Sequence, residues 1–245
     1  MGKAAIHYTA AGRTDRGRKR SGNEDAFAIG VDLRVYVVCD GMGGAAAGEV
    51  ASSMAVQETM RQMAGHIDDT PLAEVLEGAV NAAGEAIFLH ALHNPRCSGM
   101  GTTLVSLAVE DDRGWVVNVG DSRAYRLRAG QLEQITLDHS LVDEQVRLGH
   151  MNAAEARVSP LRNVITRALG TQNSVTADVF PLEIAAGDMY LLCSDGLIRE
   201  LTDERIASIL GESLPLDDLC KRLIAEANKA GGQDNITCVL VRADI

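Results

Sequence analysis

The sequence predicts an α+β fold in which antiparallel sheets are covered by helices on their outer faces. Short runs rich in Val, Leu and Tyr, bounded by Gly or Asp, are typical of strands. They cover residues 34–39, 102–109, 114–119, 123–128, 188–193 and 236–241. Helical segments do not alternate regularly with these strands, so the βαβ order of a doubly wound sheet is not favoured.

Apolar spacing predicts the helices. Residues 49–63 and 72–90 place apolar side chains on one helical face, and Thr70-Pro71 is expected to cap and begin the second helix. Shorter helices are expected over residues 202–210 and 216–229. Residues 123–135 predict a hairpin that turns at Ala129-Gly130. Because no repeat or linker divides the chain, we expect one domain over residues 1–245.

Composition narrows the class of protein. The 245 residues are 46% hydrophobic and 23% charged, which is typical of globular chains. A net charge of −11 argues against nucleic acid as a partner and is compatible with binding cations, although an acidic surface can also simply maintain solubility. No apolar run of the length of a membrane span and no signal peptide were recognised. We expect a cytoplasmic monomer that does not bind membranes.

The five cysteines are dispersed and form no Cys-x-x-Cys pair. Cys39, Cys193 and Cys238 lie within apolar runs, which predicts reduced, buried side chains in a reducing compartment. No histidine stands near these three cysteines in the sequence to activate a catalytic thiol.

Four aspartates lie among Gly, Ser or Asn at the ends of predicted strands: Asp40 with Gly41, Asp121, Asp195 and Asp234. A strand end holds a carboxylate rigidly, and a following Gly lets a main-chain carbonyl approach a metal. Carboxylates that converge without a cation repel one another. Oxygen ligands without a His or Cys cluster favour Mg²⁺ or Mn²⁺ over Zn²⁺. Each Asp-Gly alone is also ordinary turn chemistry.

An upstream segment adds further candidates. Glu24-Asp25 offers two more carboxylates. The guanidinium of Arg20 matches the oxygens of a phosphate group, although Arg20 also belongs to a basic stretch that could be plain surface.

Together these segments resemble the PP2C (PPM) family of metal-dependent protein serine/threonine phosphatases, in particular its compact bacterial members. The resemblance covers nearly the whole chain. Its blocks, in order, are Arg20-Ser-Gly-Asn-Glu-Asp-Ala26, Cys39-Asp-Gly-Met-Gly-Gly44 with Ala47-Gly-Glu-Val-Ala51, Gly101-Thr-Thr103, Val119-Gly-Asp-Ser-Arg-Ala-Tyr125, Thr136-x-Asp-His-Ser140, Ile165-Thr-Arg-Ala-Leu-Gly170, Ser194-Asp-Gly-Leu197 and Gly231-Gly-Gln-Asp-Asn-Ile-Thr237.

The resemblance implies an α-β-β-α sandwich of two antiparallel sheets flanked by helices. It also implies hydrolysis of phosphoserine and phosphothreonine in proteins, in which two Mn²⁺ or Mg²⁺ ions activate a water for attack on phosphorus. A third, weaker ion is also implied. The expected partners are phosphorylated proteins, including a bacterial Ser/Thr kinase that the enzyme opposes.

The resemblance also assigns roles to residues. Asp40 would bridge the two metals and Arg20 would bind the substrate phosphate, so both are expected to be catalytic. Residues 139–166 would form a variable flap beside the site. The implied metal ligands are Glu24, Asp25, Asp40, Gly41, Asp121, Asp195 and Asp234.

One position departs from the family pattern. Many bacterial relatives carry a His after Gly-Met-Gly-Gly that is proposed to protonate the leaving oxygen, and this chain has Ala45 there. A general acid contributes about 10²–10⁴ in rate. His139 is the one histidine near a motif, and Asp-His-Ser at the start of a loop favours a structural role. Because every implied metal ligand is present, we expect an active enzyme.

Two other functions are compatible with the pattern. One is a catalytically weak module that binds phosphoproteins or a kinase, which only Ala45 favours. The other is a metal-dependent phosphoesterase that acts on a small molecule or nucleic acid, and the acidic composition disfavours the latter.

Overall fold

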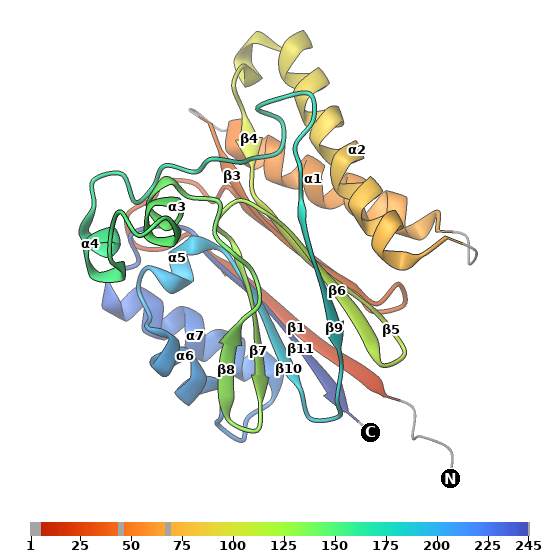
Figure 1. Ribbon diagram of the computed structural model, residues 1–245, viewed down its shortest axis with the longest axis vertical. Coiled ribbons are helices and arrows are strands. Elements are labelled where there is room, and N and C mark those ends of the chain that lie inside the picture. The colour runs from red at the N-terminus through yellow and green to blue at the C-terminus, as the bar shows by residue number, and fades with distance from the viewer. Residues whose placement is uncertain (1–5, 44–46, 67–69, 245) are drawn as a thin grey trace.

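The computed structural model describes residues 6–43, 47–66 and 70–244. Two antiparallel sheets pack face to face, as Figure 1 shows. The first sheet has the order β1 (His7–Asp15), β11 (Ile236–Asp244), β10 (Met189–Cys193), β7 (Arg123–Arg128) and β8 (Gln131–Gln134). The second has the order β2 (Asp25–Gly30), β3 (Val35–Met42), β5 (Leu104–Glu110), β6 (Arg113–Val119) and β9 (Asp178–Glu183), and β4 (Gly101–Thr102) pairs with β3.

Helices cover the outer face of each sheet (Figure 1). Helices α1 (Ala47–Ala64) and α2 (Leu72–His93) lie over the second sheet, and a short 3₁₀ turn, η1 (Pro95–Cys97), follows α2. Helices α6 (Asp203–Leu210) and α7 (Leu216–Ala230) lie on the side of the first sheet. The predicted α-β-β-α sandwich is therefore confirmed.

Three apolar layers follow from the two-residue period of the strands. In β3, Val35 and Val37 pack under α1 and α2, whereas Tyr36 and Val38 point into the layer between the sheets. In β10, Leu191 packs toward α6 and α7, and its neighbours Tyr190 and Leu192 face the layer between the sheets. These strands are buried on both faces, which explains their continuous apolar sequences.

Most predicted elements are confirmed within two or three residues. The hairpin turns at Ala129 and Gly130, whose φ angles are both positive, as the tightest hairpin turns require. The predicted cap at Thr70 is wrong, because Pro71 is the N-cap of α2 and no side chain caps the helix. The predicted strand 102–109 is interrupted at Thr103, whose N–H donates to the Asp40 carbonyl oxygen at 2.9 Å.

The segment 139–166 forms a lobe beside one end of the sandwich, where the flap was predicted. It contains α3 (Leu141–Arg147) and α4 (Ala153–Val158), which lie beside α5 (Asp195–Ile198) in Figure 1. The base of the lobe is closed by a hydrogen bond from Thr166 N–H to the His139 carbonyl oxygen at 2.8 Å.

Helix α2 is long and apolar enough to cross a membrane by length and composition, with a mean hydropathy of 1.2 over its most apolar stretch. This stretch is at odds with the expectation that no apolar run reaches the length of a membrane span. Its buried residues, such as Leu76, Val80 and Ile87, belong to the apolar core shared with α1 and the second sheet. A helix that covers a sheet needs such a face, so this composition has a structural explanation in the fold.

All five cysteines are free, and Cys39, Cys193, Cys220 and Cys238 are buried. Burial raises the pKa of the Cys193 thiol to about 12, which leaves it protonated and unreactive. The predicted burial is confirmed for Cys39, Cys193 and Cys238, Cys220 is buried as well, and Cys97 is partly exposed.

Candidate metal centre

Strand ends from both sheets meet at one end of the sandwich and bring the predicted carboxylates together. Asp40 lies near the end of β3, and Asp25 begins β2 directly opposite it. Asp195 follows β10, and Asp234 precedes β11. The carboxylates are close enough to repel one another. Burial raises the pKa of Asp40 well above its usual range, and the negative charge of Asp25 raises it further, with smaller effects from Asp195, Asp121 and Asp234.

The backbone of Asp40 is held by two threonines. Asp40 N–H donates to Thr103 Oγ1 at 3.0 Å. The Asp40 carbonyl oxygen accepts from Thr103 N–H and from Thr102 Oγ1–H, both at 2.9 Å. Because the main chain is fixed in this way, the Asp40 side chain has a defined place at the rim of the cleft.

Gly41 lies where no side chain fits. Its N–H donates to the Glu24 carbonyl oxygen at 3.1 Å. A Cβ at this position would meet the backbone of Gly48 in α1, and it would lie 2.6 Å from the Glu24 carbonyl oxygen. The sequence requires Gly here because three backbone segments touch.

Asp25 is held by hydrogen bonds on one of its carboxylate oxygens. Its Oδ2 accepts hydrogen bonds from Ser194 Oγ at 2.8 Å and from Thr237 Oγ1 at 2.6 Å, which ties β2 to the ends of β10 and β11. Its Oδ1 is buried without a partner. Burial, with the charges of Asp195 and Asp234, raises the pKa of Asp25 to about 7 despite these hydrogen bonds.

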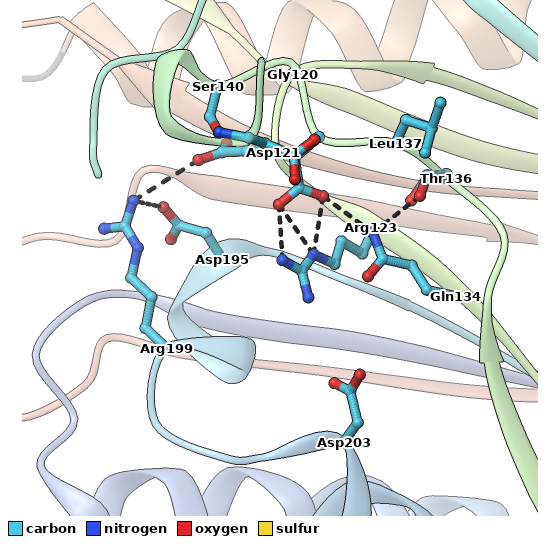
Figure 2. Close-up of polar contacts among 12 residues, drawn as sticks. Gly120, Asp121, Arg123, Gln134, Thr136, Leu137, Ser140, Asp195, Arg199 and Asp203 are labelled. Carbon is cyan, nitrogen blue, oxygen red and sulfur yellow. Dashed lines mark hydrogen bonds and ion pairs between the residues drawn. The ribbon is translucent and has the colours of Figure 1, made fainter. Parts of the chain in front are cut away.

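Two arginines form ion pairs with Asp121, Asp195 and Asp234. Arg20 Nη2 donates to Asp234 Oδ2 at 2.8 Å, so Arg20 is held in the site and is not a free surface residue. Figure 2 shows that the Arg199 guanidinium reaches both Asp195 and Asp121. Arg199 was not among the predicted site residues, although its spacing of four residues from Asp195 is a signal for an ion pair on one helical turn.

Asn235 was also missed as a site residue. Its Oδ1 accepts from Glu24 N–H at 2.8 Å, and its Nδ2 donates to the carbonyl oxygens of Arg16 and Gly22 at 3.0 and 2.9 Å. The side chain therefore ties the loop that carries Arg20 and Glu24 to the start of β11. Only tertiary structure could show this role.

His139 has the structural role that was predicted. It is buried, its Nδ1 accepts from Gly120 N–H at 3.1 Å, and its Nε2 lies 3.1 Å from Asp178 Oδ2. Burial lowers the pKa of His139, and the ring is therefore neutral at pH 7. It fixes the backbone just before Asp121.

The donor set fits hard divalent cations. It consists of oxygens, and the buried Oδ1 atoms of Asp25 and Asp195 have no partner. Within the described ranges, however, no three His, Cys, Asp or Glu side chains are already gathered around one point as a metal-binding group. Arg20 pairs with Asp234 Oδ2 and Arg199 with Asp195 Oδ2.

Two cavities open at the site. One, of about 370 Å³, is lined by residues that include Arg20, Glu24, Asp40 and Asp234. The other, of about 480 Å³, lies between the flap lobe and the segment 198–203. Asp121, Asp195 and Arg199 line both cavities and so stand between them.

Comparison with known proteins identifies the family. The sequence model of the family described as "Protein phosphatase 2C" matches residues 14–241. The chain belongs to this family. It is 37% identical to the serine/threonine phosphatase Stp of Listeria monocytogenes over 95% of both chains. It is 36% identical to the protein phosphatase PhpP of Streptococcus pneumoniae, covering 93% of this chain and 94% of the relative.

Solved structures of phosphatases agree with this family assignment. The serine/threonine phosphatase PstP/Ppp of Mycobacterium tuberculosis superposes with a TM-score of 0.90 at 38% identity, covering 98% of this chain and 100% of that one. The catalytic domain of PstP, in complex with two manganese ions, has a TM-score of 0.89 at 37% identity, covering 99% and 100% of the two chains. PP2C phosphatases use Mn²⁺ or Mg²⁺, and the donor set at Asp40 suits the same ions.

The roles of individual site residues stay predictions. The structure brings Glu24, Asp40, Gly41, Asp121, Asp195 and Asp234 to one cleft, and Asp25 lies opposite Asp40 in the β2–β3 pair without lining that cleft. Ala45, the position that departs from the family pattern, lies outside the described residues.

Proposed function

We propose that this chain hydrolyses phosphoserine and phosphothreonine in proteins with two divalent cations. The observation that carries the proposal is the convergence of Asp40, Asp195 and Asp234 at one cleft, beside Arg20 and at the ends of strands from both sheets. The names of the relatives, serine/threonine phosphatase and protein phosphatase, support the class of substrate.

When bound, the two ions activate a water and neutralise the phosphate oxygens. Asp40 would contact both ions, with Asp195 and Asp234 completing their ligands and the Gly41 carbonyl beside them. Glu24 and Asp25 would act directly or through water. A third ion would need Asp121 together with Asp195.

Arg20 is the residue of this chain that would orient the substrate phosphate. Its guanidinium can offer two parallel N–H donors to two oxygens of a phosphate group. In the structure it donates to Asp234, with about half of its side chain exposed to the cleft and solvent. To bind the phosphate, Arg20 would have to leave its ion pair with Asp234.

The leaving serine or threonine oxygen needs a proton, and Ala45 cannot supply it. His139 is excluded as the donor by its burial and by its bonds to Gly120 and Asp178. We propose that water in the cleft supplies this proton.

The partners are proposed from the chemistry of the class. We propose phosphorylated proteins, among them a Ser/Thr kinase, as substrates of a cytoplasmic monomer. Four buried cysteines without disulfides agree with a reducing compartment. A phosphoprotein-binding module without activity is the second candidate, and the presence of Asp40, Asp195 and Asp234 in one cleft favours the enzyme.

The test is a turnover assay on a phosphothreonine peptide and on a small phosphoester, with Mn²⁺, with Mg²⁺ and with excess EDTA. The proposal predicts metal-dependent release of phosphate from the peptide that EDTA abolishes. Peptide binding without turnover would instead support the binding module, and turnover of the small phosphoester alone would contradict a protein substrate.

A further inference from the structure

Arg199 places a permanent positive charge among the carboxylates of the centre. It caps the C-terminus of the four-residue helix α5, and one helical turn brings its guanidinium back over Asp195, with which it forms an ion pair. Its Nη2 also lies 3.7 Å from Asp121 Oδ2, and its Nη1 lies 3.7 Å from Asp234 Oδ2 (Figure 2 shows the first two partners).

The two oxygens of Asp195 have different surroundings. Oδ2 pairs with Arg199, whereas Oδ1 is buried and has no partner. Asp195 can therefore give Oδ1 to a divalent cation and keep its ion pair with Arg199. Asp234 has a closer arginine of its own, because Arg20 lies 2.8 Å from its Oδ2. The distinctive partners of Arg199 are thus Asp195 and Asp121.

Asp121 depends on Arg199 for its neutralisation. Among the ion pairs of the residues that the structure describes, Arg199 is the one cationic partner of Asp121. The Asp121 side chain is only 9% exposed, so solvent screens this charge poorly. A cation at this position is needed to offset a buried carboxylate.

We propose that the guanidinium of Arg199 occupies the cation position beside Asp121, so that this chain binds two divalent ions and not three. The inference rests on the two-metal centre proposed above. A third ion between Asp121 and Asp195 would have to displace Arg199 or lie against its like charge. Arginine keeps its charge at every pH at which a protein is folded, so the position is filled without a metal.

The test counts ions by calorimetric titration with Mn²⁺ alone. Wild type and Arg199→Lys, which retains the charge, are expected to bind two Mn²⁺ per chain. Arg199→Met, which keeps much of the side-chain volume without the charge, is expected to bind a third Mn²⁺ more weakly. The double variant Arg199→Met/Asp121→Asn is expected to return to two.

Three ions in wild type, or two in a folded Arg199→Met, would overturn the inference and leave the phosphatase function standing. No Mn²⁺ in wild type would overturn both. If Arg199→Met does not fold, Asp121→Asn in the wild-type background decides the matter. The inference predicts an unchanged Mn²⁺ stoichiometry in that variant, and the loss of one bound ion would contradict it.

Discussion

Asp25 and Asp40 lie directly opposite each other in the antiparallel pair of β2 and β3. Opposed residues in such a pair place their side chains on the same face of the sheet. Burial raises the pKa of both carboxyl groups, and the charge of Asp25 raises that of Asp40 further. Without a cation this pair opposes folding, and a bound cation removes the cost.

Removing one of these charges is expected to stabilise the metal-free chain. In EDTA, Asp40→Asn should raise the melting temperature by about 2–4 °C for each kcal/mol of repulsion removed. Thermal unfolding measures this. Asp188→Asn is the matched control, because Arg128 donates to both Asp188 carboxylate oxygens at 2.6 Å. Burial alone would raise the pKa of Asp188, but its hydrogen bonds lower it below the usual value. The control should lower the melting temperature, and a fall in both variants would contradict the account.

The same repulsion predicts how pH affects the metal-free chain. Burial, ahead of neighbouring charges, raises the pKa of Asp25 to about 7, whereas the unfolded value is about 3.9. Between these values the folded state binds more protons than the unfolded state. The contribution of Asp25 to stability therefore increases as pH falls from about 7 toward 4.

Denaturant unfolding in EDTA at pH 7.5 and pH 5 measures this contribution as the difference between wild type and Asp25→Asn. Wild type should gain stability relative to the variant on acidification. The comparison cancels the opposite effect of His139, whose lowered pKa makes the fold less stable as pH falls below about 6.5. An equal response of the two proteins would refute the prediction.

Gly41→Ala is expected to disrupt the centre sterically. The added Cβ would meet the backbone of Gly48 and Glu24, so β3 and α1 would have to separate. We expect a loss of stability of about 1–3 kcal/mol, as for other overpacked positions. Gly78→Ala in α2 is the control, since nothing lies within 4 Å of its new Cβ, and it should stabilise by about 0.4–1 kcal/mol. A Gly41→Ala protein as stable as wild type would contradict the close approach.

His139→Asn separates a structural histidine from a catalytic one. A general acid would contribute about 10²–10⁴ in rate and one limb of the pH–rate profile. The bonds of His139 to Gly120 and Asp178 predict instead a loss of about 1–3 kcal/mol of stability with an unchanged shape of the pH–rate profile. Loss of a limb of the profile in a folded variant would show that His139 transfers the proton.

The sequence predicted the central strands and the edge strand β8, which belongs to the predicted hairpin, and missed the other edge strands. β3, β10 and β11 are apolar on both faces because they are covered on both sides. The edge strands β1, β2 and β9 are partly exposed along their length and have no continuous apolar run. Edge strands need less apolar surface, so their pattern is weak.

The candidate site was also predicted only in part. Carboxylates at strand ends have a local signal, and the structure brings Asp40, Asp195 and Asp234 to one cleft. Arg199 and Asn235 act through partners that only the fold brings near, such as Asp121 and the loop at Gly22. A pattern read along the chain contains no information about such contacts.

The central claim is that the cleft at Asp40 holds the ions that drive hydrolysis. The most direct measurement compares phosphate release from a phosphothreonine peptide by wild type and Asp40→Asn in saturating Mn²⁺, with folding of both checked by thermal unfolding. Bound ions stabilise the transition state by several kcal/mol. The account therefore predicts a loss of about 10³-fold or more in kcat/KM for the variant. A folded Asp40→Asn protein that retains wild-type turnover would contradict it.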